Sequence, residues 1–301
     1  MTATLIGSDG LRVRSNGRWG EQKLAFLDHF APPALDATTA KRTRYYIDLF
    51  AGPGLNVTAH APRKEFEGSP VRLLQMHGSK SPATAFTHAV FVNANANDHH
   101  ALEARVNRLV AEGKSRIRRE RIQLIREDAN VALPRILEHV HRKSYVFAFA
   151  DIEGPRQWPW ASVRALRRTG HESVDLYMLF PLHMGIDRLF PYNRTITPRC
   201  ADTVTTFFGT EDWKELERRR RTDAESPRMY RELEDLYLRQ LRQQWNYAES
   251  VMNVRMTGSR FLYQMFFASN HDAGRRIAQW ARRQAREDDS AIAGQGDLFA
   301  G

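Results

Sequence analysis

A hydrophobic segment that runs into a glycine-rich loop is the sharpest chemical signal in the sequence. Residues 44–50, RYYIDLF, lead directly into Ala-Gly-Pro-Gly. Gly52 and Gly54 would let a ligand approach backbone N–H groups at the carboxyl end of a strand, where open α/β sheets bind ligands. Asp48 would hold an ammonium group and repel a pyrophosphate. The segment therefore predicts a site for a methionine moiety rather than for a nicotinamide dinucleotide, whose third fingerprint glycine is absent.

Two further strand ends supply candidates for the nucleoside part of such a ligand. Asn93 ends the next expected strand, where a carboxylate would usually accept from ribose hydroxyls and an amide would bind them less strongly. Asp128 follows the third strand and would either accept from an adenine amino group or cap the next helix. The predicted cofactor-binding residues are Asp48, Phe50, Ala51, Gly52, Pro53, Gly54, Asn93, Asp128 and Ala129.

The fourth expected strand places two carboxylates at the same edge of the sheet. Asp151 and Glu153 follow it, and we predict both as catalytic residues, Asp151 before Glu153, acting as a general base or orienting a substrate donor. A structural loop role for Asp151 is the alternative. Cys200, the only cysteine, lies far downstream, so a cytosine-C5 mechanism with a thiolate nucleophile is excluded. The histidines lack the spacing of a metal site, and we predict none.

A sheet of parallel strands would bring these residues together, because the carboxyl ends of its strands lie at one edge. Strand and helix patterns alternate from residue 44 to residue 180, which predicts an α/β sheet, mostly parallel, with helices on both faces. Residues 250–256 and 261–268 then form two strands joined by a turn at Gly258 and Ser259, predicting a C-terminal antiparallel hairpin. This layout is that of the Rossmann-like methyltransferase sheet, for which the cofactor is S-adenosylmethionine.

The same patterns predict the domain boundaries. We expect a flexible N-terminus over residues 1–17, a single methyltransferase-like domain over 18–287 with a helical insertion at about 182–246, and a flexible tail over 288–301. The first helix, with Leu24, Leu27 and Phe30 on one face, is expected to stop at Pro32 and Pro33.

The charge of the chain favours a polyanionic partner. The formal net charge is +10, and basic residues cluster at 114–121, 218–221 and 275–286. Arg218, Arg219, Arg220 and Arg221 are predicted to contact nucleic acid; solvated helix faces and an arginine-rich proteome are the alternatives. The sequence has neither a signal-peptide pattern nor an apolar run long enough to span a bilayer, so we expect no membrane association and a cytoplasmic location.

With these motifs, the chain resembles the three-Cys-motif partner protein family, which is similar to S-adenosylmethionine-dependent methyltransferases. The resemblance covers most of the sequence and is carried by the YIDLFAGPG segment, the REDAN segment at 126–130, Asp151 with Gly154, and FFASNHDAG at 266–274. Two positions depart from the family pattern: Asn93 replaces an acid, and Asp-Ile-Glu-Gly replaces Asp-Pro-aromatic-Gly. The resemblance implies a partner protein with a three-cysteine motif, similar to radical enzymes.

The C-terminus carries a second, shorter resemblance. Gln295, Asp297, Leu298 and Phe299 belong to a segment, QGDLF, that resembles the peptide by which bacterial replication and repair proteins bind the DNA sliding clamp. A frayed polar tail is the alternative. Together with the basic charge, this segment favours a DNA-associated role.

Two functions are consistent with these observations. The first is a protein that binds S-adenosylmethionine and methylates nucleic acid, in DNA repair or phage-related DNA metabolism. The second is a non-catalytic protein that binds nucleic acid or acts as a scaffold for the three-cysteine partner. A small-molecule methyltransferase is a third. The sequence leaves open whether the chain is an enzyme.

Overall fold

Seven strands form one central sheet in which β10 runs opposite to both its neighbours. The computed structural model describes residues 5–59, 63–168, 170–190, 195–222, 226–255 and 261–297. The order across the sheet is β6-β5-β2-β7-β8-β10-β9: the five strands from β6 to β8 pair in parallel, and β10 is antiparallel to both its neighbours, β8 and β9. The strands are β2 (Arg44–Asp48), β5 (His88–Val92), β6 (Ile122–Ile125), β7 (Tyr145–Ala150), β8 (Ser173–Phe180), β9 (Tyr247–Arg255) and β10 (Phe261–Ser269). The predicted Rossmann-like sheet is thereby confirmed; the turn expected at Gly258 and Ser259 lies outside the described residues.

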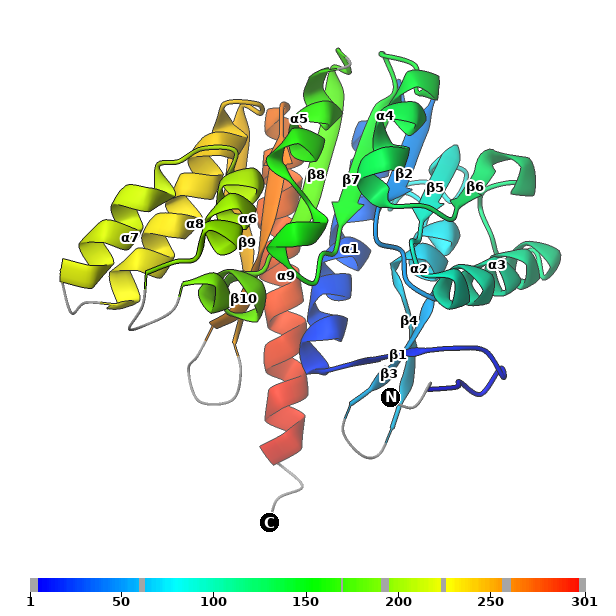
Figure 1. Ribbon diagram of the computed structural model, residues 1–301. Helices are drawn as coiled ribbons and strands as arrows, with labels where there is room; N and C mark the ends of the chain where they lie inside the picture. The colour runs from blue at the N-terminus through cyan, green and yellow to red at the C-terminus, as the bar shows by residue number, and fades with distance from the viewer. Residues whose placement is uncertain are drawn as a thin grey trace.

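The helices cover both faces of this sheet (Figure 1). They are α1 (Arg18–Ala37), α2 (Ser69–Gln75), α3 (Ala96–Ala111), α4 (Ala129–His139), α5 (Trp160–Arg168), α6 (Pro198–Phe208), α7 (Trp213–Thr222), α8 (Ser226–Arg242) and α9 (Asp272–Asp297). The three helices α6, α7 and α8 follow β8, where the sequence pattern placed a helical insertion. Within the described parts of the chain, no helix has the length and apolar character that crossing a bilayer requires.

Aromatic side chains fill the space between the sheet and its helices. On one face the ring of Phe30 from α1 lies 4.9 Å from Phe147 and 4.8 Å from Phe267. On the other face Tyr237 of α8 lies 6.0 Å from Phe266, the neighbour of Phe267 in β10. Burying a side chain of this size stabilises the fold by about 1.5–3 kcal/mol. Because β7 and β8 are buried on both faces, β7 is apolar throughout, and β8 is apolar from Leu176 to Phe180 rather than alternating.

The helix α1 continues through Pro32 and Pro33 to Ala37, so the prediction that it stops at these prolines was wrong. Each proline removes one backbone hydrogen bond from the helix. The side chains on either side of them, Phe30 and Leu35, are fully buried in the core. Burial of this face compensates for the lost hydrogen bonds, a tertiary effect that helix propensity does not contain.

The N-terminal segment differs from the flexible tail that composition suggested. Within it, β1 (Arg14–Asn16) pairs with β3 (Leu55–Thr58), which also pairs with β4 (Glu65–Glu67), in a small second sheet. The carboxylate of Asp9 accepts two hydrogen bonds of 2.8 Å from Arg105 on α3. Ion pairs and strand pairing therefore fix residues 5–17, and neither interaction leaves a local pattern in the sequence.

At the other end of the chain, α9 packs beside α1 (Figure 1) and is helical to Asp297, beyond residue 287 where we expected the domain to end. Residues 281–287, ARRQARE, are all of types that favour helix, which supports continuation of the helix at this point.

Candidate active site

A cavity of about 990 Å³ opens at the carboxyl edge of the parallel strands. The loop after β2 contributes Phe50, Ala51, Gly52, Pro53 and Gly54 to its lining. The N-terminal segment contributes Arg12 and Arg14, α1 contributes Lys23, and β10 contributes Tyr263. Asp98, Asp151 and Glu153 also line it. The segment after β8 adds Arg188, so the cavity is lined by four cationic and three anionic side chains beside a glycine loop.

The two glycines of the loop have different roles. Both have left-handed backbone conformations, with φ of 62° at Gly52 and 81° at Gly54. A Cβ on Gly54 would lie 2.9 Å from Cδ1 of Leu102, so this glycine lets the loop pack on α3. The three atoms nearest to a Cβ on Gly52 would all belong to the Arg14 side chain, and the first of them lies 3.7 Å away. Gly52 is therefore the position where the backbone is open to a ligand in the cavity.

Asp48 lies beneath this loop and is fully buried. Its carboxylate accepts hydrogen bonds from the Ser69 hydroxyl (2.6 Å), the Tyr46 hydroxyl (3.0 Å) and the Phe50 amide (3.2 Å). Burial raises the pKa of Asp48 to about 6, and the three donors act against this rise. Through these contacts Asp48 holds the glycine loop in place. Its binding of a ligand ammonium group stays a prediction.

Asn93 also acts on the loop. It is buried, and its Nδ2 donates a 2.8 Å hydrogen bond to the carbonyl oxygen of Gly52. The side chains that line the cavity beyond β5 are instead Asn95 and Asp98. Asn95 is the N-cap of α3 and accepts hydrogen bonds from the Asn97 and Asp98 amides.

The residues predicted to bind adenine lie at the start of α4. The Asp128 side chain accepts a 2.8 Å hydrogen bond from the Asn130 amide and is the N-cap of this helix. Ala129 is buried. Of the two roles left open for Asp128, the capping role is the one seen in the structure; neither residue lines the cavity, which spans the glycine loop and the β7 edge.

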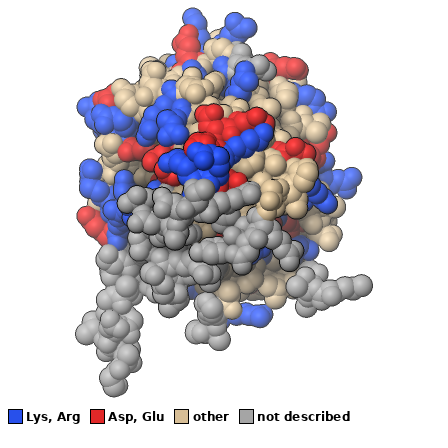
Figure 2. Space-filling model, turned by 60° about the vertical axis from the view of Figure 1, so that its left-hand side comes forward, with Lys and Arg blue, Asp and Glu red and all other residues tan. Residues whose placement is uncertain are grey.

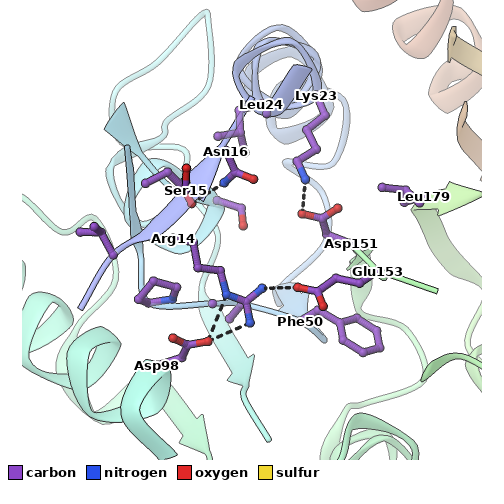
Figure 3. A pocket seen from close by; sticks show the side chains of 18 of the residues that line it. Arg14, Ser15, Asn16, Lys23, Leu24, Phe50, Asp98, Asp151, Glu153 and Leu179 are labelled. Atoms are coloured by element: carbon purple, nitrogen blue, oxygen red, sulfur yellow. Dashed lines mark hydrogen bonds and ion pairs between the residues drawn. The ribbon is translucent and has the colours of Figure 1, made fainter. Parts of the chain in front are cut away.

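The carboxylates predicted as catalytic both lie at the cavity and both have basic partners (Figure 3). The Lys23 ammonium donates a hydrogen bond to Oδ2 of Asp151. Nη1 of Arg14 lies 3.3 Å from Glu153, and the same guanidinium donates 2.8 and 3.1 Å bonds to Asp98. Arg14, Lys23 and Asp98 were not predicted as site residues, because no sequence motif marks them.

No metal site is present in the described portion of the chain, because its His, Cys, Asp and Glu side chains do not gather in groups of three.

Two arginines of the cluster on α7, Arg218 and Arg219, form ion pairs with nearby glutamates. Arg218 donates hydrogen bonds of 2.7 and 2.8 Å to Glu215, and Arg219 lies 3.0 Å from Glu232. Figure 2 shows basic and acidic side chains interleaved on the face it presents. The side chains of Arg220 and Arg221 lie outside the described residues, as do those of Gln295 and Asp297 and the whole of Leu298 and Phe299.

Comparison with known proteins gives similarities to solved structures. No family model and no curated protein matches the sequence. A Legionella pneumophila protein of the DUF519 family model is 9% identical, with a TM-score of 0.47 over 83% of this chain and 84% of the other. A Thermotoga maritima SAM-dependent O-methyltransferase is 12% identical (TM-score 0.34; 78% and 62%). The plantazolicin methyltransferase BamL, solved with SAH, is 10% identical (TM-score 0.37; 84% and 87%). The site is therefore interpreted from its own residues.

Proposed function

We propose that this protein binds S-adenosylmethionine in the cavity beside Gly52 and is a methyltransferase-like protein. The proposal rests on the observation that Gly52 and Asp151 line the same cavity. Gly52 opens backbone to the cavity, and Asp151 follows the neighbouring parallel strand. Ligands of doubly wound sheets bind at this edge.

The chain's own residues would position the ligand. Asp48 and Asn93 hold the glycine loop from below, and the mixed charges of the wall suit a moiety with both a carboxylate and an ammonium group. When bound, the cofactor supplies a methyl group on a sulfonium, open to in-line attack. Lys23 binds Oδ2 of Asp151, which leaves Oδ1 to accept a proton or a hydrogen bond from the acceptor.

For the acceptor we propose nucleic acid, supported by the formal net charge of +10. The paired state of Arg218 and Arg219 reduces what α7 can contribute to such binding. A DNA-associated role with a three-cysteine partner is the more specific proposal. The family resemblance supports the partner, and the basic charge with the QGDLF segment supports the association with DNA.

A non-catalytic binding role is the second candidate. It is favoured because groups that would act on a cofactor or an acceptor are engaged within the protein: Asn93 binds the Gly52 carbonyl and Asp151 binds Lys23. On this view the fold and its cavity persist while turnover is lost.

Calorimetric titration with S-adenosylmethionine tests the proposal. Wild-type protein should bind one equivalent, and Gly52→Asp should bind at least tenfold more weakly, because its side chain enters the cavity. Gly113→Asp is the matched control. Gly113 has φ of 67° and open space around its Cβ position, and it does not line the cavity. This variant therefore has the same backbone strain as Gly52→Asp but places no side chain in the cavity. Folded wild-type protein that binds no cofactor would overturn the proposal.

Transfer of a labelled methyl group separates the two candidates. DNA and RNA are offered to the cofactor-loaded wild-type protein and to Asp151→Asn. Transfer that falls at least tenfold in the variant supports catalysis through Asp151. Cofactor binding and nucleic-acid binding without transfer supports the non-catalytic role.

A further inference from the structure

Arg14 places a guanidinium group directly over the glycine loop. It lies in β1, where it pairs with Asn56, just after the loop. Its Cδ and Nε are each 3.7 Å from the position of a Cβ on Gly52. The N-terminal segment therefore supplies a cation beside Gly52, where the backbone is open to the cavity. Figure 3 shows this Arg14 side chain between Asp98 and Glu153.

The two edges of this guanidinium are held differently. Nε and Nη2 both donate to Oδ2 of Asp98, whose side chain is 1% exposed. Nη1 lies 3.3 Å from Glu153, whose side chain is 66% exposed. Charge-assisted N–H···O bonds are usually about 2.7–2.9 Å long, so the Glu153 contact is the weaker one. Burial opposes the charge of Arg14, but Asp98 and Glu153 raise its pKa above the ordinary value.

Of the three other cations that line the cavity, Arg12 and Lys23 each contact another carboxylate oxygen, and Arg188 lies in the segment after β8. Nε of Arg12 lies 2.7 Å from Oδ1 of Asp98, and Lys23 binds Asp151 on the far wall. Among the described cations that line the cavity, Arg14 is the one that the contacts place beside Gly52 and that also contacts a mostly exposed carboxylate, which can move away.

We propose that Arg14 determines specificity for ligands with a free carboxylate, which replaces Glu153 at Nη1. This inference rests on the proposed function, because the carboxylate is that of the amino-acid portion of S-adenosylmethionine. Asp98 holds the guanidinium in place while the exchange occurs. A guanidinium suits this task because its donors lie in a fixed plane.

A pair of ligands that differ only in this group tests the inference. S-adenosylmethionine and its decarboxylated form are titrated into wild-type protein, Arg14→Gln and Arg14→Lys. The loss of a charge-assisted hydrogen bond should weaken binding of the complete cofactor about 10- to 100-fold in Arg14→Gln. Binding of the decarboxylated form should change less than about twofold, and Arg14→Lys should be intermediate for the complete cofactor.

Arg108→Gln is the control for displacement of the N-terminal segment. Arg108 binds the same segment through Asp9 at 2.9 Å but does not line the cavity, so this variant should bind both ligands as wild type does. Equal losses for both ligands in Arg14→Gln, or no loss for either, would overturn the inference while leaving the proposed function intact. Wild-type protein that binds neither ligand would instead overturn the proposed function.

Glu153→Gln gives a second measurement that does not depend on the folding of the Arg14 variants. Removing the competing carboxylate should strengthen binding of the complete cofactor about two- to tenfold and leave the decarboxylated form unchanged. Weaker or unchanged binding of the complete cofactor in Glu153→Gln contradicts the exchange.

Discussion

The ammonium group of Lys23 on α1 hydrogen-bonds the carboxylate of Asp151, the residue that follows β7. The two positions are 128 residues apart, and their side chains are only 11% and 24% exposed. The pair therefore ties the first helix to the edge of the sheet where we propose that methyl transfer occurs.

Removal of this lysine should destabilise the fold. Lys23→Met leaves a mostly buried carboxylate without its cation, and we expect the free energy of unfolding in urea to fall by about 2 kcal/mol. Lys214→Met breaks an exposed pair with Glu211 and should cost less than about 0.5 kcal/mol. Equal effects of the two substitutions would show that the Lys23 pair is no stronger than a surface contact.

The packing of the glycine loop predicts an order of stabilities. Gly54→Ala combines a left-handed backbone with a Cβ 2.9 Å from Leu102, and we expect unfolding to become easier by about 3 kcal/mol. Gly113→Ala has similar strain without a neighbour and should cost about 1 kcal/mol. Chemical denaturation measures both. If the contact is the cause, Leu102→Val should recover part of the loss in the Gly54→Ala background.

The buried Asp175 on β8 predicts a pH effect. Burial raises the pKa of Asp175 to about 6, although hydrogen bonds from Ser269 and Tyr145 oppose the rise. The folded protein then holds this proton more tightly than the unfolded chain, whose carboxyl has a pKa near 3.8. The contribution of Asp175 to the free energy of unfolding therefore decreases as pH rises from about 4 to 6, by up to about 3 kcal/mol.

Asp175→Asn should remove this contribution. Urea denaturation at pH 4 and pH 7 should show the variant gaining up to about 3 kcal/mol relative to wild type over this range. Asp48 titrates in the same window, but it is present in both proteins, so the comparison isolates Asp175. Parallel pH curves for variant and wild type would contradict the prediction.

Arg105 connects the N-terminal segment to the glycine loop. Its guanidinium, 6% exposed, binds Asp9 and donates bonds of 2.8 Å to the Arg12 carbonyl and 2.6 Å to the Pro53 carbonyl. Arg105→Met leaves Asp9 largely buried without its main partner. We expect a loss of about 3 kcal/mol and faster amide hydrogen exchange across residues 9–16. The exposed Arg108→Gln should have a smaller effect on both, and unchanged exchange in Arg105→Met would refute this role.

Local patterns in the sequence were enough to predict the central sheet. Residues 44–50 could be assigned because a buried parallel strand needs a continuous apolar run, and the glycine pair after it marks a turn at its carboxyl end. The hairpin of β9 and β10 followed from the same kind of pattern. The small sheet of β1, β3 and β4 was missed because its strands have only three or four residues.

The site residues also divide into those that the sequence predicted and those that it did not. The sequence by itself determined that Gly52, Gly54 and Asp151 share one edge of the sheet, because the carboxyl ends of parallel strands meet there. Only the tertiary structure decided which charges meet at that edge. Arg14 contacts Asp98 and Glu153 across 84 and 139 residues, and such ion pairs follow no spacing rule. They depend on how α1 and the N-terminal segment pack against the finished sheet, which no local pattern encodes.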